Sequence, residues 1–165
     1  MKPNIKTMAQ EKKFGEIEAA VYKDHALIGD LVALLGEKNG DIRSGVLNLL
    51  SRVGFDFPND TRPHLPTLIA MLDDPDMFIK IDAANAVGNL GFNFKDSAAQ
   101  STPKLKAMLA HKQSLVRQEA AYALGNIGFA VACDTARAFA LGHQRAHNGI
   151  AHSAAGAKNH MEIVF

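Results

Sequence analysis

Three stretches of this chain align without a gap: "IRSGVLNLLSRVGF" (42–55), "IKIDAANAVGNLGF" (79–92) and "VRQEAAYALGNIGF" (116–129), each beginning 37 residues after the one before. All three open on an aliphatic residue followed by a cation, and all three close on glycine and phenylalanine. A fixed period of a few tens of residues is typical of repeat proteins, in which each unit packs on its neighbours. The fold prediction therefore starts from this repeat.

The apolar residues of each stretch recur with the period of a helix. In the middle stretch they share one helical face, and they are Ile79, Ala83, Ala86, Val87 and Leu90. A second segment has the same period, because Pro66, Leu68, Met71 and Leu72 correspond to Pro103, Leu105, Met108 and Leu109. We therefore predict a unit of two helices, best formed over 41–74 and 76–110, with a third unit beginning at 114.

Small residues and glycines have two predicted roles in these units. Gly54, Gly91 and Gly128 follow the last apolar residue of each stretch, so we predict that they end the first helices in a left-handed conformation. Ala120 and Ala121 make a thin helix surface, which lets neighbouring helices approach to about 8–10 Å. The stretch at 119–128 is thus predicted to be packing material without catalytic chemistry.

These residues resemble the HEAT repeats, and especially the subset called phycobilisome-lyase HEAT-like repeats. "VRQEAAYALGNIG" is the stretch most similar to that subset, while the first stretch departs from it at Val46, Leu47 and Ser51. The resemblance covers residues 26–129. It implies an all-α, right-handed alpha-alpha superhelix, a HEAT/armadillo-like solenoid of about three helix pairs, whose second helices line a curved surface that binds another macromolecule.

The two ends of the chain carry the repeat less clearly. We predict an N-terminal helical cap or partly ordered arm over 1–25, the repeat array over 26–129, and an alanine- and histidine-rich helix with a mobile tail over 130–165. Carrying the second-helix pattern forward by 37 residues places Gly142, Arg145 and Ala146 at apolar positions. The apolar face is lost there, so the array could be part of a longer one.

Composition limits the classes of function. With 165 residues, 47% hydrophobic residues and a net charge of +1, the chain is predicted to form one folded domain without a strong overall field for nucleic acid or anionic lipid. Its single cysteine favours a reducing compartment, so we expect a cytoplasmic location or a nuclear one. No secretion signal and no membrane span are predicted, because no apolar segment has the required length.

No catalytic, cofactor or metal site is predicted. His143 and His147 lie four residues apart, with His152 or His160 as a third ligand, but the glutamate of a zinc-protease motif is absent and a solvated histidine-rich tail is the favoured interpretation. Cys133 has no catalytic context. The iron hydroxylases built on similar repeats require His-Glu pairs, and this chain has none.

Cations recur in two patterns. A run without an acid suggests an anion or nucleic-acid surface, although the small net charge favours an ordinary charged face: Lys104, Lys106, His111, Lys112 and Arg117. Arg43, Lys80 and Arg117 recur at one position of the repeat, and we expect ion pairs with Asp82 or Glu119 of neighbouring units. Asn89 and Asn126 recur as well, and we expect them to cap loop backbone.

We predict a non-enzymatic protein-protein interaction scaffold, within a larger complex. Thr67, Ala70, Lys104 and Lys106 of the second helices are the predicted contacts. "GFDF" and "GFNF" add Phe57 and Phe94, which would form a hydrophobic docking strip if these second rings are exposed while the first rings are buried. Two hypotheses remain beside it: a subunit of a bilin lyase or isomerase, suggested by the resemblance alone, and a phosphate-backbone or nucleic-acid binding module.

Overall fold

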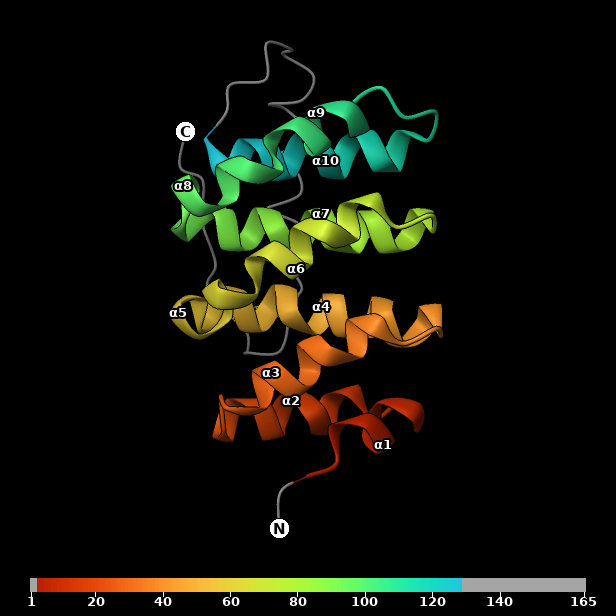
Figure 1. Ribbon diagram of the computed structural model, residues 1–165, viewed down its shortest axis with the longest axis vertical. Coiled ribbons are helices and arrows are strands. Elements are labelled where there is room, and N and C mark those ends of the chain that lie inside the picture. Colours follow the sequence, from red (N-terminus) through yellow and green to blue (C-terminus); the bar gives the residue numbers. More distant parts are fainter. Residues whose placement is uncertain (1–2, 129–165) are drawn as a thin grey trace, which may run out of the picture.

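Residues 3–128 are described by a computed structural model, and they form an all-α repeat solenoid without a strand among them. The helices stack in chain order along the longest axis, so the N-terminal helices and α10 lie at opposite ends of the described part (Figure 1). This confirms the predicted fold class. The handedness of the superhelix stays a prediction.

Each unit pairs one long helix with a second, broken one. The first helices are α4 (Gly40–Asp56), α7 (Met77–Asn93) and α10 (Ser114–Ile127). The second helix after α4 consists of α5 (Pro58–Thr61), η2 (Arg62–His64), α6 (Leu65–Ala70) and η3 (Met71–Asp73). After α7 come α8 (Lys95–Ala98), η4 (Ala99–Ser101) and α9 (Thr102–Met108). The units predicted at 41–74 and 76–110 and the start at 114 are confirmed.

Local chemistry explains where these helices begin. The side chains of Asn39 and Asp76, which are 37 residues apart, accept hydrogen bonds from backbone N–H groups in the first turns of α4 and α7. The second helices are divided because α5, η2, α6 and α9 each carry a proline in their first two positions. Proline cannot donate a backbone hydrogen bond, so it suits a helix start and interrupts a helix interior. Pro103 accordingly lies in the first turn of α9.

One of the three predicted glycine stops is confirmed. Gly128 has a φ of +86° and ends α10 in the left-handed conformation. The prediction is wrong for Gly54 and Gly91, which lie inside α4 and α7, and both helices continue for two more residues. They end instead at Phe57 and Phe94, where the backbone turns to φ values of −126° and −130°.

Close approach between neighbouring units explains why glycine occupies the two interior positions. A Cβ atom at Gly54 would lie 3.0 Å from Cδ1 of Leu90, and one at Gly91 would lie 2.5 Å from Cγ1 of Ile127. Both distances are shorter than an ordinary contact between carbon atoms. The glycines make room for the apolar side chains of the following unit.

Gly88 shows the same principle against backbone. A Cβ atom there would lie 2.8 Å from the Cα atom of Ala123, so α7 and α10 meet almost main chain to main chain. The alanines on both sides of this contact are buried, and they are Ala83, Ala84, Ala120 and Ala121. The prediction that these small residues are packing material is confirmed.

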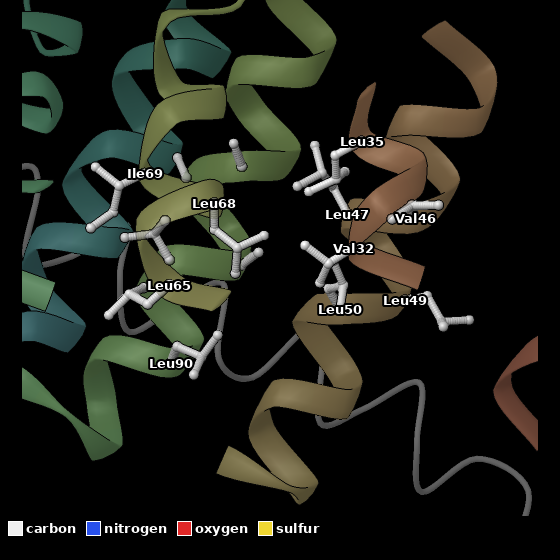
Figure 2. Close-up of a cluster of buried hydrophobic side chains, with 14 of the residues drawn as sticks. Val32, Leu35, Val46, Leu47, Leu49, Leu50, Leu65, Leu68, Ile69 and Leu90 are labelled. Carbon is white, nitrogen blue, oxygen red and sulfur yellow. The ribbon is translucent and has the colours of Figure 1, made fainter. Parts of the chain in front are cut away.

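The hydrophobic core is continuous through the stack. One cluster of buried apolar side chains extends from Ile5 to Ile127. Figure 2 shows its middle part, with side chains of α3 (Leu27–Ala33), η1 (Leu34–Gly36), α4, α6 and α7; those labelled are Val32, Leu35, Val46, Leu47, Leu49, Leu50, Leu65, Leu68, Ile69 and Leu90. Each unit therefore closes the apolar face of the unit before it.

The N-terminal residues continue the stack with a break in the first helix. α1 (Ile5–Gln10) and α2 (Phe14–Lys23) are separated at Lys12, which has a φ of +57°. The ring of Phe14 covers Gly45, where a Cβ atom would lie 2.3 Å from it. The division at residue 25 stays a prediction, and the helix and tail predicted for 130–165 lie outside the described residues.

Candidate functional site

The surface of the first helices carries a polar ladder that links three successive units. Ser51 of α4 donates to Oδ1 of Asn85 at 2.6 Å, and Asn89 of α7 donates to Ser51 Oγ at 2.6 Å. Tyr122 of α10 donates its hydroxyl to Asn89 at 3.1 Å. Asn89 therefore bridges helices and does not cap loop backbone as predicted. These side chains are occupied by each other, so the ladder holds the stack in register.

Asp82 belongs to the same surface. The hydroxyl of Ser44, one unit earlier, donates to its carboxylate. Burial raises the pKa of Asp82 above its ordinary value of 3.8, against the opposing effect of hydrogen bonds from Ser44 and Asn48, and the nearby charge of Asp76 also raises this pKa. Asp82 is thus a half-buried acid within a structural contact.

Two of the recurring cations, Arg43 and Arg117, have partners other than those predicted. The guanidinium group of Arg43 donates to the carbonyl of Glu37 at 3.1 Å and pairs with Asp74 at 3.4 Å. Arg117 donates to the carbonyls of His111 and Lys112 at 2.8 and 3.0 Å. The prediction of pairs with Asp82 or Glu119 is wrong, because helical side chains point back toward the N-terminus and reach the preceding turn instead. The two arginines therefore stabilise the turns between units by hydrogen bonds to backbone carbonyls.

The second helices hold the four contact residues predicted for them. Thr67 and Ala70 are exposed on α6, and Lys106 is exposed on α9. Lys104 is half-buried, and its Nζ atom donates to the carbonyl of Ile69 at 3.2 Å and pairs with Asp73 at 2.6 Å. Lys104 thus connects two successive second helices. Partner contact by these residues stays a prediction.

The phenylalanine pairs are arranged in the opposite sense to the docking strip that we considered. Phe57 and Phe94, the second rings, are half-buried and pack against the core. The first rings are the exposed ones, at 59% for Phe55 and 54% for Phe92. The helices run past their glycines, so the first ring is still on the outer face of the helix while the second ring turns inward at the helix end. The condition for a strip made by Phe57 and Phe94 is not met.

A hollow of about 320 Å³ lies between the second helices of the two best-formed units. Its apolar wall comes from α6 and the preceding turn, and its polar wall from α8 and η4; the lining residues are Arg62, Pro63, Leu65, Pro66, Ile69, Ser97 and Gln100. Arg62 stands at this hollow with its guanidinium carbon 4.8 Å from the centre of the Phe94 ring. That contact is a cation–π interaction.

Arg62 and this hollow were not predicted from the sequence. Arg62 lies in "DTRPHLP", between the two repeated segments, where no motif marks it. The available signal was its position, because Arg62 lies 37 residues after His25 and Phe94 lies 37 residues after Phe57. In both units the side chain at this position lies against a phenylalanine ring.

Residues 3–128 contain neither a candidate metal-binding cluster nor a helix able to span a membrane. No group of three His, Cys, Asp or Glu side chains in this range is arranged to hold a metal ion. None of its helices has both the length and the apolar character needed to cross a membrane. The candidates His143, His147, His152, His160 and Cys133 lie outside the described residues.

The comparisons with known proteins agree with this architecture. No curated protein matches the chain. The family model described as HEAT repeats matches residues 65–146, which begin at α6 and include α7, α9 and α10. The repeat of 37 residues, the paired helices and this match lead to one conclusion: the chain is a HEAT-repeat protein.

Proposed function

We propose that the chain is a non-enzymatic interaction module that binds a protein partner on the surface of its second helices. The hollow between α6 and α8 is the observation that supports this proposal most directly. It combines an apolar wall with a few polar groups, as binding sites for side chains commonly do, and its volume is near the lower end of ligand pockets. The proposal places the module in the cytoplasm, within a larger complex.

The phosphate-backbone hypothesis receives less support from the geometry. Lys104 and Arg117, two members of the basic run, are engaged in contacts within the chain. His111 accepts a hydrogen bond from the backbone N–H of Gln113 through its Nδ1 atom. The groups that remain are too few for the array of phosphate contacts that gives nucleic-acid binding its affinity. The bilin hypothesis is tested by an absorbance spectrum of the protein purified from its source.

The experiment is affinity purification of the tagged full chain from its native extract, followed by mass spectrometry. Two variants separate the two faces: Arg62→Gln alters the second-helix surface, and Phe92→Ser alters the exposed ring on the first-helix surface. Lys38→Gln, an exposed cation in the turn before α4, is the control for loss of one charge. We expect one set of proteins to be retained by Phe92→Ser and Lys38→Gln and lost by Arg62→Gln. Equal recovery by all four proteins would contradict the proposed surface.

A further inference from the structure

Two successive interfaces of the array place equivalent residues around one phenylalanine. Arg62 lies 37 residues after His25, and Phe94 lies 37 residues after Phe57. The ring of His25 lies 4.0 Å from the ring of Phe57, centre to centre, and the guanidinium carbon of Arg62 lies 4.8 Å from the centre of Phe94. The two interfaces therefore build the same arrangement from different side chains.

The third member of the arrangement differs. At the earlier interface Asp60, from the start of the second helix, accepts at 2.8 Å from Nδ1 of His25. The equivalent position 37 residues later is Ser97, which has no charge. Within residues 3–128, no carboxylate oxygen lies within 4.0 Å of the guanidinium nitrogen atoms of Arg62, although Asp96 is the adjacent residue. The later interface thus lacks the acid that completes the earlier one.

An arginine in this setting is prepared to bind a carboxylate. The guanidinium carbon of Arg62 lies 4.8 Å from the centre of the Phe94 ring, and this cation–π contact restrains the group, while its N–H groups donate no hydrogen bond within residues 3–128. A guanidinium group is always charged and matches a carboxylate with two parallel hydrogen bonds. Since its orientation is already restricted, less conformational entropy is lost when an acid binds.

The hollow beside Arg62 adds a second requirement. Pro63, Pro66, Leu65 and Ile69 make its apolar wall. An aliphatic side chain that fills this space removes apolar surface from water, which a free phosphate ion or a sugar-phosphate backbone cannot do. Ser97 and Gln100, from α8 and η4, add polar groups to the lining.

We propose that the hollow between α6 and α8 binds an acidic segment of a partner protein, in which an Asp or Glu carboxylate pairs with Arg62 and a neighbouring aliphatic side chain fills the space beside it. The partner's carboxylate takes the place that Asp60 occupies at the preceding interface. This inference rests on the proposed function and names the chemistry of the partner at the same surface.

Replacing the missing acid within the chain gives the sharpest test. Ser97→Asp restores the side chain found at the equivalent position of the earlier interface, so it should pair with Arg62 and close the site. Ser97→Ala changes the same residue without adding a charge, so it should leave the site open. Arg62→Gln removes the charge, and Lys38→Gln is the control for loss of a cation elsewhere.

The probe is a random seven-residue peptide library displayed on phage and selected on the immobilised full chain. We expect enriched sequences that contain Asp or Glu next to Leu, Ile or Val. The most enriched peptide, synthesised with a fluorescent label, should bind the unaltered chain and Lys38→Gln with equal affinity by fluorescence polarisation, and it should bind Ser97→Ala more tightly than Ser97→Asp. Ser97→Asp and Arg62→Gln should each weaken binding by about tenfold or more, as expected for a lost charged hydrogen bond.

Thermal unfolding of each variant, followed by circular dichroism, shows that a loss of binding is not a loss of folding; Ser97→Asp should unfold at or above the temperature of the unaltered chain. Enriched peptides without an acid, or acidic peptides that bind Ser97→Asp unchanged, would overturn this inference and leave the interaction module standing. A selection that enriches no peptide, together with a purification that recovers no protein partner, would overturn both.

Discussion

At the residue scale, glycine has two different roles at equivalent-looking positions in this chain. Gly128 ends α10 because its φ of +86° is a conformation that residues with a Cβ atom rarely adopt. Gly91, one period earlier, lies inside α7, and glycine is required there because a Cβ atom would lie 2.5 Å from Cγ1 of Ile127. Sequence alone does not separate these roles, since both depend on what lies beside the glycine.

We predict that Gly88→Ala destabilises the protein by about 1–3 kcal/mol. The new methyl group would lie 2.8 Å from the Cα atom of Ala123, and backbone can move aside only by separating α7 from α10. Urea denaturation of the purified chain measures the change in the free energy of unfolding.

Gly29→Ala on α3 is the matched control, because nothing lies within 4 Å of the added methyl group. In that helix alanine should stabilise by about 0.5–1 kcal/mol relative to glycine. Equal unfolding midpoints for the two variants would contradict the packing that we describe between α7 and α10.

We predict that the effect of Asp82→Asn on the free energy of unfolding becomes more stabilising as the pH rises. Burial raises the pKa of Asp82 in the folded protein above its ordinary value of 3.8, so the folded state holds this proton more tightly than the unfolded state. The resulting contribution to stability is fully present below pH 3.8 and is lost as the pH rises through the folded-state pKa.

Asparagine does not titrate, so the variant lacks this dependence. The stability of Asp82→Asn relative to the unaltered chain should therefore be greater at pH 7 than at pH 3.5, as measured by urea denaturation at both values. A difference that is constant between the two pH values would show that the carboxyl group of Asp82 titrates alike in the folded and unfolded states.

At the scale of the element, the sequence predicted helices better than their ends. Helical periodicity located the first helices and Pro103 located a second one, because both signals depend on residues within a single segment. The ends of α4 and α7 were predicted wrongly, because Gly54 and Gly91 face the next unit and stay helical. The same two-residue extension explains why the exposed rings are Phe55 and Phe92.

We predict that the two rings at the end of α7 differ in their effect on stability. Phe94→Ala should cost about 1–3 kcal/mol, because it removes a half-buried ring and the surface on which Arg62 rests. Phe92→Ala should change stability by less than about 0.5 kcal/mol, because that ring is 54% exposed. Thermal unfolding of both variants tests this order, and the reverse order would contradict the position of the helix end.

The candidate site could be predicted only in part at this scale. The second helices were predicted as separate helices, and Thr67, Ala70 and Lys106 are exposed on them. Lys104 was chosen for its charge, but its contact with Asp73 and Ile69 joins two units and depends on the stacking distance. Arg62 was missed because its environment combines residues of three separate segments.

At the scale of the whole molecule, stability should be local along the stack. The described units contact mainly their neighbours, and the core is one continuous cluster without a centre. A substitution that destabilises one interface should therefore lower the local stability of the adjoining helices most, and the effect should decrease along the array.

We predict that Gly88→Ala accelerates amide hydrogen exchange in α10 and in the C-terminal half of α7, while the amides of α2 and α3 exchange as in the unaltered chain. Mass spectrometry of peptic fragments after exchange into deuterated buffer gives the rates for each helix. Uniform acceleration through all helices would show that the array unfolds as one cooperative unit.

The pairing of His25 with Asp60, beside an unpaired Arg62, also has a meaning for how such arrays could be extended. A unit with aspartate at the position of Asp60 closes the interface before it. A unit with serine at that position, as at Ser97, leaves a docking position. Duplicating the serine-bearing unit would add docking positions at a regular rise, so valency for a repetitive acidic ligand would grow with length while each single contact stayed weak. The number of units would then set the avidity, and the side chain at this one position would decide whether a unit contributes a binding site.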